Sequence, residues 1–388
     1  MLPADLPVPS ACPCEHAGAG ASAALHPGPR TFIFRFTGSG HEYFRIWVVN
    51  LLLSLATFGI YSAWAKVRRL QYFDRNTSLA GATFDFHGSP KAILHGRLLA
   101  LALLASYQYA IGFSAGAGLA IAVGLLLAAP FLMRGALRFR LGHTSYRAIP
   151  FAFTGSVRHA YLAYMAPAIL FVLPGVMIAV FGEAAWTALA LLLYAAWPLM
   201  SGLMKRYQYG HVRYGDLASS TSLPLRGFTG IYLLGAVWMA AACALVVLLV
   251  FCAAVVVAPR TTGDLVMWIF GATTLLIIGV LAYLMLGPYQ QVRVLNFCLA
   301  RTCFPGVRFV STLSLRPYMR LQLRNMALTI LSLGLYRPFA VVAAYRYRME
   351  HLAVRCEGDI DAILAGASRP QGAAGDGATD FFGIDLSW

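Results

Sequence analysis

Long apolar runs alternate along the chain with short basic stretches. Four runs approach or exceed the roughly 20 apolar residues that a helix needs to cross a bilayer; they cover Tyr161–Phe181, Ala184–Met204, Ile231–Ala258 and Leu265–Leu286. A fifth run, Leu98–Met133, is long enough for two crossings, with a small-residue turn near Ser114–Gly118. The pattern predicts an all-α, polytopic membrane helix bundle with six transmembrane helices in three hairpins.

Two shorter hydrophobic segments flank this bundle, at 46–65 and 326–345. In the second, the uninterrupted apolar run Met326–Tyr336 covers only 11 residues. Runs of about 10–14 residues favour re-entrant or interfacial elements over full spans. We expect both segments to be re-entrant or in-plane, entering and leaving on the cytoplasmic side. The alternative is two ordinary spanning helices, which gives eight crossings.

The positive charge is distributed unevenly. Of 30 Lys and Arg residues, 28 lie in residues 1–349, together with only eight of the 15 acids. The basic residues gather in the loops between predicted hairpins, which by the positive-inside rule face the cytoplasm. The predicted basic cytoplasmic rim contains Lys66, Arg68, Arg69, Arg134, Arg138, Lys205, Arg206, Arg320 and Arg324. Such a rim faces anionic headgroups, so the net charge of +15 favours the lipid bilayer over nucleic acid as a partner.

Internal repeats run through the chain. The string F-x-F-x-G-S begins at Phe34, Phe84 and Phe151, and Phe228-Thr-Gly230 is a truncated echo. An aromatic residue also follows a proline, or an alanine in the first case, nine residues later in Ala63/Tyr72, Pro130/Phe139, Pro198/Tyr207, Pro288/Phe297 and Pro338/Tyr347. The two ends of the chain match at an offset of 275, as Asn50 with Asn325 and Tyr61 with Tyr336. These matches predict five copies of one unit.

The repeated phenylalanines suggest one role and leave a second open. Alternating residues of an extended chain share one face, and aromatic rings favour the membrane–water interface. We therefore expect the strips to be interfacial anchors; the alternative is a ligand vestibule. The strips comprise Phe34, Phe36, Phe84, Phe86, Phe151 and Phe153.

Three regions follow from these patterns. Residues 1–30 are Pro-, Ala- and Gly-rich and are expected to be a disordered tail, residues 31–349 form an integral membrane domain of five related units, and residues 350–388 form an acidic tail. Cys12-Pro-Cys14-Glu-His16 has no second pair of ligands, so it falls short of the usual zinc patterns. We therefore expect no metal and no cofactor.

Two stretches carry a family resemblance. The run from Asn50 to Arg68, which contains Gly59-Ile-Tyr61-Ser-Ala-Trp64, resembles the hallmark of the YjgN-like family of bacterial inner-membrane proteins. The run from Asn76 to Gly88 resembles it as well. The resemblance implies an inner-membrane location. It implies no established activity, so it supplies no catalytic residues.

The sequence favours transport or organisation over catalysis. It contains no Gly-rich phosphate loop, no G-x-S-x-G elbow and no H-E-x-x-H motif, so we expect no enzyme, although His143 and His211 recur in register. The predicted spans contain no acid in their middles, which disfavours coupled transport.

A passive transporter or channel is the leading hypothesis, and a membrane scaffold or lipid-organising protein is the alternative. In the first case the candidate polar lining is Asn50, Tyr61, Gln108, Asn325 and Tyr336. In the second, Asn50 and Asn325 merely satisfy backbone groups where a helix ends. The sequence specifies neither a substrate nor an oligomeric state.

Overall fold

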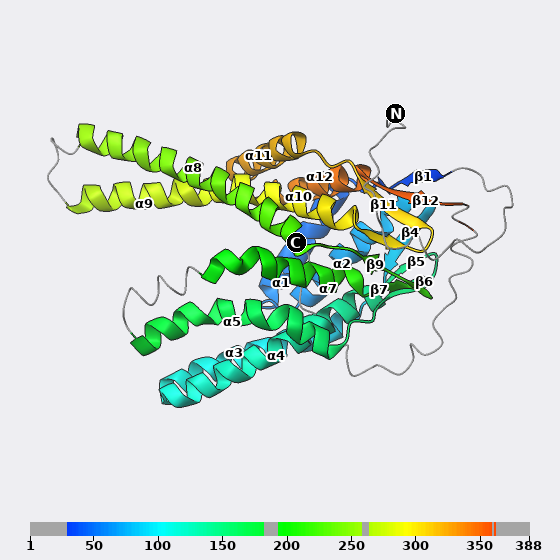
Figure 1. Cartoon of the computed structure of the whole chain (residues 1–388), viewed down its shortest axis with the longest axis horizontal. Coiled ribbons are helices and arrows are strands. Elements are labelled where there is room, and N and C mark those ends of the chain that lie inside the picture. The colour runs from blue at the N-terminus through cyan, green and yellow to red at the C-terminus, as the bar shows by residue number, and fades with distance from the viewer. Residues whose placement is uncertain (1–28, 182–192, 258–263, 359–360, 362–388) are drawn as a thin grey trace.

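The computed structural model describes residues 29–181, 193–257, 264–358 and 361 (Figure 1). Helical hairpins extend toward one end of the molecule, and the strands gather at the other end. The helices are α1 (Gly40–Ala56), α2 (Ser62–Arg75), α3 (Pro90–Phe113), α4 (Ala115–Gly142), α5 (Val157–Phe181), η2 (Leu193–Ala196), α7 (Trp197–Gly210), α8 (Leu225–Val257), α9 (Asp264–Leu281), the π-helical η4 (Ala282–Leu286), α10 (Gly287–Leu299), α11 (Leu315–Leu331) and α12 (Arg337–Glu350).

The strands form two antiparallel sheets. One has the order β1-β12-β11-β10-β9, and the other has the order β2-β3-β4-β5-β6-β7-β8. The strands are β1 (Arg30–Ile33), β2 (Arg35–Phe36), β3 (Thr77–Leu79), β4 (Ala82–Phe86), β5 (Thr144–Tyr146), β6 (Ile149–Phe153), β7 (Val212–Tyr214), β8 (Leu217–Ala218), β9 (Ser220–Thr221), β10 (Thr302–Phe304), β11 (Val307–Ser311) and β12 (Leu352–Cys356).

The two sheets join at both edges into a closed ring of strands. β1 and β2 are separated only by Phe34, whose N–H donates to the carbonyl of Leu352 at 3.1 Å. β8 and β9 are separated only by Ser219, whose N–H donates to the carbonyl of Val212 at 2.8 Å. The segment β1–β2 thus pairs with β12 along its first part and with β3 along its second, and the segment β8–β9 pairs with β7 and then with β10, so these two segments link the sheets into a ring.

Tight turns connect the strands on the side of the ring away from the helices. Ala80 and Gly81 link β3 to β4, and Arg147 and Ala148 link β5 to β6. All four residues have positive φ, between 46° and 79°. Two-residue turns with this geometry match the twist of the flanking strands, so they set the register of each pair.

Each helical hairpin is closed at its base by an equivalent backbone hydrogen bond. The residue that enters the hairpin donates its N–H to the carbonyl of the residue that leaves it. The five bonds are Thr37 to Asn76 (2.9 Å), His87 to His143 (2.8 Å), Thr154 to His211 (2.9 Å), Ser222 to Arg301 (3.1 Å) and Thr312 to His351 (2.9 Å). Each hairpin therefore begins and ends at the ring of strands.

The repeated motifs build these bases. A Cβ atom added at Gly88 would lie 2.4 Å from the ring of Phe86, and one added at Gly155 would lie 2.6 Å from the ring of Phe153. Each glycine thus leaves room for the second phenylalanine of its strip. The aromatic hydroxyl nine residues after the proline, or after the alanine, reaches the serine carbonyl of the same unit: Tyr72 to Ser39 (2.7 Å), Tyr207 to Ser156 (3.2 Å) and Tyr347 to Ser314 (3.3 Å).

The recurring histidines are structural in the same way. The Nδ1 atoms of His143, His211 and His351 lie 2.7, 3.0 and 2.7 Å from the carbonyl oxygens of Phe139, Tyr207 and Tyr347. These carbonyls belong to the last turn of a helix, where backbone acceptors lack a partner within the helix. The histidines therefore help to end the helices.

Three sequence predictions need correction. The all-α fold is wrong, because short strands join the helical hairpins. The acidic tail was predicted to begin at 350, yet Leu352–Cys356 forms β12 between β1 and β11. The echo at Phe228 lies inside α8, and its unit begins earlier, at β8 and β9. Most of the predicted N-terminal tail lies outside the described residues, but Arg30 already belongs to β1.

The membrane-spanning candidates agree with the sequence in part. Among the described residues, three helices are long and apolar enough to cross a membrane: Gly116–Gly142, Leu225–Cys252 and Gly271–Leu299. The predicted turn between two crossings is present at Ser114, where α3 ends and α4 begins. Tyr161–Phe181 lies within α5, whereas Ala184–Met204 falls partly outside the described residues.

Candidate functional site

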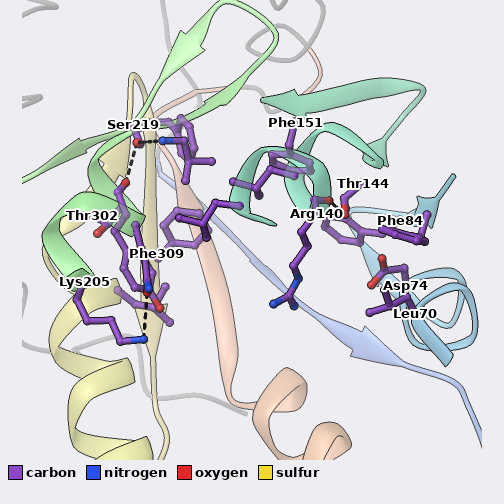
Figure 2. Close-up of a pocket in the computed structure, with 18 residues that line it drawn as sticks. Leu70, Asp74, Phe84, Arg140, Thr144, Phe151, Lys205, Ser219, Thr302 and Phe309 are labelled. Atoms are coloured by element: carbon purple, nitrogen blue, oxygen red, sulfur yellow. Dashed lines mark hydrogen bonds between the residues drawn. The ribbon is translucent and has the colours of Figure 1, made fainter. Parts of the chain in front are cut away.

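A cavity of about 540 Å³ lies where the helix ends meet the ring of strands (Figure 2). The closing helices α2, α4, α7 and α10 contribute their last turns, and the strands contribute inward-facing side chains. The lining residues are Leu70, Asp74, Phe84, Phe86, Leu137, Arg140, Leu141, Thr144, Phe151, Lys205, Gln208, Tyr209, Val212, Ser219, Leu299, Thr302, Phe304 and Phe309. We call this space the central cavity.

A second cavity, of about 270 Å³, occupies the interior of the ring of strands. Its lining is apolar apart from the two tyrosine hydroxyls: Phe34, Leu79, Phe84, Tyr146, Phe151, Tyr214, Leu217, Phe304, Val307, Phe309 and Val354. Phe84, Phe151, Phe304 and Phe309 line both cavities. The two spaces are therefore neighbours that share a wall of phenylalanine rings.

Three charged residues line the central cavity. Arg140 extends from α4 into its middle, with Lys205 on one wall and Asp74 on the opposite wall (Figure 2). Within the described part of the chain, Asp74 accepts no hydrogen bond and forms no ion pair with Arg140 or Lys205. The described lining thus combines two bases with one acid.

Burial shifts the titration of two of these groups. It raises the pKa of Asp74 to about 6, against the opposing field of the Arg140 guanidinium and with a smaller contribution from Asp85. Burial also lowers the pKa of Lys205. Both shifts have one physical cause, since a low-dielectric surrounding disfavours the charged form of either group. The central cavity is therefore most cationic when Asp74 is protonated.

The small hydroxyl side chains of the cavity are already hydrogen-bonded to the protein. The hydroxyls of Thr144 and Thr302 donate to the carbonyls of Arg140 and Cys298 at 2.9 and 2.8 Å. Ser219 donates to the carbonyl of Tyr209 at 2.8 Å. Satisfied groups of this kind contribute little to binding a ligand, so the charged side chains and the hydroxyl of Tyr209 remain as the groups available for recognition.

Lys205 belongs to a short relay of side chains. Its Nζ atom donates to Oε1 of Gln208 at 3.2 Å, and Nε2 of Gln208 donates to the hydroxyl of Tyr164 at 3.0 Å. An ammonium group carries three N–H donors. The relay uses one donor to orient the lysine, which leaves the others directed toward the cavity.

The described residues hold no cluster of three or more His, Cys, Asp or Glu side chains that suits a metal ion. The motif at Cys12, Cys14 and His16 lies outside these residues. His143 and His211, which recur in register, lie with Nδ1 at hydrogen-bonding distance from helix carbonyls, as described above.

The predicted polar lining residues lie away from both cavities. Asn50 and Asn325 are buried between helices, 8% and 2% exposed, and Nδ2 of Asn325 donates to the carbonyl of Ala340 at 3.2 Å. Tyr61 stacks on Trp64, and Tyr336 stacks on Phe339. Gln108 is exposed on α3. The structure brings these five residues to no common site in the part of the chain it describes.

The phenylalanine strips lie inside the protein. Phe34, Phe84 and Phe151 face the interior of the ring, while Phe36, Phe86 and Phe153 are at most 6% exposed. The extended conformation that the alternation predicts is present, but buried rings cannot reach lipid headgroups. The vestibule alternative describes their position better than the anchor interpretation does.

The predicted basic rim lies on the parts of the helices that approach the ring. Lys66, Arg68 and Arg69 are on α2, Arg134 and Arg138 on α4, Lys205 and Arg206 on α7, and Arg320 and Arg324 on α11. Arg134 donates through Nε to the carbonyl of Gly155 at 2.7 Å, at the base of the third hairpin. Lys205 faces the central cavity instead of the surface.

Sequence reasoning missed Asp74 and Arg140 as cavity residues. A signal for Asp74 was available in the repeat alignment: two residues after the recurrent aromatic, the other units carry Leu141, Tyr209, Leu299 and Met349. An acid at a position that is otherwise apolar or aromatic is unusual, and it could have identified Asp74 as a candidate site residue. The same alignment places Arg140 one residue after the aromatic, beside Phe73, Gln208, Cys298 and Arg348 in the other units.

Comparisons with known proteins agree with the apolar helices. A family model described as "bacterial protein of unknown function (DUF898)" matches residues 31–381. The inner membrane protein YjgN of Salmonella typhimurium is 32% identical over 134 residues, which cover 32% of this chain and 32% of that protein. The inner membrane protein YjgN of Escherichia coli O157:H7 is 30% identical over 131 residues, again 32% of each chain. The matched segment thus spans about a third of these relatives, and no solved structure matches the chain.

Proposed function

Because the chain belongs to the DUF898 family of bacterial proteins of unknown function, and has relatives named inner membrane protein YjgN, we propose that it is a passive transporter or channel of the bacterial inner membrane. The observation that carries the proposal is the pair of adjoining cavities at the ring of strands. The central cavity has a mixed lining that includes charged side chains, and the ring interior is an apolar constriction. Constrictions of this kind gate pores by excluding water.

The proposal includes an arrangement in the membrane. The hairpins α3/α4, α5/α7 and α8/α9 cross the bilayer and return, which gives six spans, while α1/α2 and α11/α12 enter it only partway. The equivalent bonds at the five hairpin bases support this arrangement as five copies of one unit. The exposed apolar side chains on α8, such as Leu233, Trp238 and Phe251, support contact with lipid.

The ring of strands and the basic rim lie on the cytoplasmic side in this proposal. Every hairpin returns to the ring, so one side of the membrane receives all the basic helix ends, as the positive-inside rule expects. Anionic headgroups are then the partner of the rim. Neither nucleic acid nor a catalytic step has a place in the proposal.

A flux measurement tests the proposal. Proteoliposomes are mixed with hyperosmotic glycerol, acetate or phosphate, and their volume recovery is followed by light scattering. Val307 lines the ring interior, so Val307→Trp fills it, and we expect entry of the permeant solute to fall to the rate of empty liposomes. The control is Ile33→Trp, on the outer face of the ring, where the side chain is 42% exposed; its flux should match the unmodified protein.

The results that contradict transport are equally clear. If none of the solutes enters proteoliposomes faster than empty liposomes, or if Val307→Trp leaves a measured flux unchanged, the cavities are no path for solute.

A membrane scaffold is the second candidate, and one observation favours it. Arg68, Arg69 and Arg206 expose charge next to the membrane-facing helices. A scaffold needs the basic surface and no open path. In the assay above it gives no flux, while replacing these three arginines with glutamine lowers the retention of anionic lipid.

A further inference from the structure

The central cavity and the ring interior differ sharply in chemistry although they share a wall. The charged residues Asp74, Arg140 and Lys205 line the first, whereas none of the described residues that line the second is charged. A ligand that fills both spaces must therefore have a polar end and an apolar end.

The polar end of such a ligand meets a surplus of positive charge. Arg140 carries five N–H donors in a planar fork, and its guanidinium points into the middle of the cavity (Figure 2). Lys205 offers the donors that Gln208 does not use. Arginine and lysine recognise carboxylate and phosphate through short charge-assisted hydrogen bonds. The geometry thus favours an anionic group.

The apolar end meets a surface with no unsatisfied polar group among the described residues that line it. The hydroxyl of Tyr146 donates to the carbonyl of Leu79 at 2.6 Å, and that of Tyr214 donates to the carbonyl of Tyr146 at 3.0 Å. An apolar cavity of this kind holds water poorly. A hydrocarbon chain gains free energy by entering it, at about 0.8 kcal/mol for each CH₂ group removed from water.

We propose that the two cavities together bind one single-chain amphiphile, with its carboxylate or phosphate group between Arg140 and Lys205 and its apolar chain inside the ring of strands. The inference deepens the proposed function, on which it rests, by naming the class of the transported or bound solute. Free fatty acids or alkyl phosphates, and anionic lipids of the bilayer, share this headgroup chemistry.

The test is photo-crosslinking in nanodiscs of phosphatidylcholine. The probe is dodecyl phosphate with a diazirine at the end of its chain, and labelled peptides are located by mass spectrometry. We expect the label on strands that carry the shared phenylalanines, β4, β6, β10 and β11. The double variant Arg140→Gln/Lys205→Gln should reduce this labelling roughly tenfold, since two charge-assisted contacts are lost. The matched control is Arg158→Gln, which removes an exposed charge at the start of α5, outside both cavities and the basic rim, and should leave the labelling unchanged.

Competitors separate the alternatives. Unlabelled dodecanoate should displace the probe, while dodecyltrimethylammonium, which has the same chain and the opposite charge, should not. If phosphatidylglycerol added to the nanodisc competes as well as dodecanoate, the proposed headgroup chemistry is supported, and the ligand is a lipid of the bilayer. Inorganic phosphate that competes as well as dodecyl phosphate overturns the inference, because the chain then adds nothing.

Other outcomes also overturn it: labelling confined to the lipid-facing surfaces of α8 and α9, or labelling that Arg140→Gln/Lys205→Gln leaves intact. Val307→Trp provides a second check that retains all charges, and it should abolish labelling inside the ring. Binding is measured here without flux, so its failure is separable from failure of the transport proposal. A protein that binds dodecyl phosphate but passes no solute contradicts transport alone.

Discussion

The short hairpin α1/α2 and the long hairpin that begins with α8 have equivalent bases and differ in length. Their entry residues make equivalent bonds, Thr37 to Asn76 at 2.9 Å and Ser222 to Arg301 at 3.1 Å. Above the base, α1 has 17 residues and α8 has 33, which correspond to roughly 25 and 50 Å at 1.5 Å per residue. The ring of strands therefore fixes where a hairpin starts, and the apolar sequence alone sets how far it reaches.

The short hairpin and the longer hairpins also differ in the charges that they contribute to the central cavity. The short hairpin supplies its acid, Asp74 on α2, while the longer hairpins supply its bases, Arg140 on α4 and Lys205 on α7. The hairpins are alike in the backbone bonds at their bases and unlike in the few side chains that point inward.

The largest effect is expected at the hairpin bases, in short and long hairpins alike. A Cβ atom at Gly38 would lie 2.5 Å from the ring of Phe36, and one at Gly155 would lie 2.6 Å from the ring of Phe153. Gly38→Ala and Gly155→Ala should therefore each cost about 1–3 kcal/mol through overpacking. Thermal unfolding in nanodiscs measures the change.

Gly142→Ala, where an added Cβ atom meets nothing within 4 Å, is the control and should be nearly silent. A loss of stability in only one of the two base variants would show that the bases are not equivalent.

A smaller, pH-dependent effect is expected at Asp74, the acid of the short hairpin. Burial raises its pKa to about 6 from the ordinary value of 3.8 for an aspartate. The stability linked to this group is fully present below about pH 4 and is lost as pH rises through about 6. Asp74→Asn should remove that loss and stabilise the protein at pH 8, by no more than about 3 kcal/mol at roughly 1.4 kcal/mol for each pKa unit. The ionisable groups that interact electrostatically with the Asp74 carboxyl are Arg140, Asp85 and Tyr345.

Asp85 provides a control of opposite sign. Its contacts with Arg75 lower its pKa, so its stabilising contribution is present at neutral pH and is lost on acidification. Unfolding midpoints of Asp74→Asn and Asp85→Asn, measured between pH 4 and pH 8, should diverge from the unmodified protein in opposite directions. Parallel profiles would contradict the burial argument for Asp74.

The smallest effect on stability is expected at the tip of the short hairpin. Phe58 is 99% exposed, in a turn where it and Gly59 have positive φ. Phe58→Cys, in a background whose seven native cysteines are replaced, should change stability by less than about 0.5 kcal/mol. If this hairpin enters the bilayer only partway, an impermeant thiol reagent should label position 58 from neither side of the membrane.

Ile33→Cys in the same background reports on which side of the membrane the ring of strands lies. It should be labelled only after the cytoplasmic side is exposed. Labelling of position 58 from the periplasm would favour a full span, and labelling of position 33 from the periplasm would reverse the proposed orientation.

The sequence predicted the hairpins better than the strands, for a physical reason. Apolar length is a strong signal, so α8 and the break at Ser114 were predictable. β3 and β5 have three residues each, too few for a periodic pattern. Other pairings join distant parts of the chain, as β1 and β12 do where Arg30 lies opposite Cys356. The cue that could have revealed them was local: β-branched and aromatic residues around the two-residue turn at Ala80–Gly81.

The central cavity was harder to predict than the fold. Asn50 and Tyr61 attracted attention because they are polar residues next to apolar runs and recur at the other end of the chain. Asn50 and Asn325 are buried away from both cavities, so their recurrence marks a packing position that the two short hairpins share. Asp74 is the one acid among its aligned positions, and Arg140 shares its residue type with Arg348 alone. The closure of the ring brings Asp74 and Arg140 to one cavity.

Closure of the ring by β12 also sets the order in which the protein can be completed. β12 pairs with β1 and β11, at residues 30–33 and 307–311. During synthesis from the N-terminus, β1 has no partner on this side until residue 356 has left the ribosome. For most of translation the nascent chain therefore carries an open β-edge, an attachment point for chaperones and for aggregation. β12 is the last strand of the ring to be synthesised, so the ring of strands can close only after Leu352–Cys356 has been made.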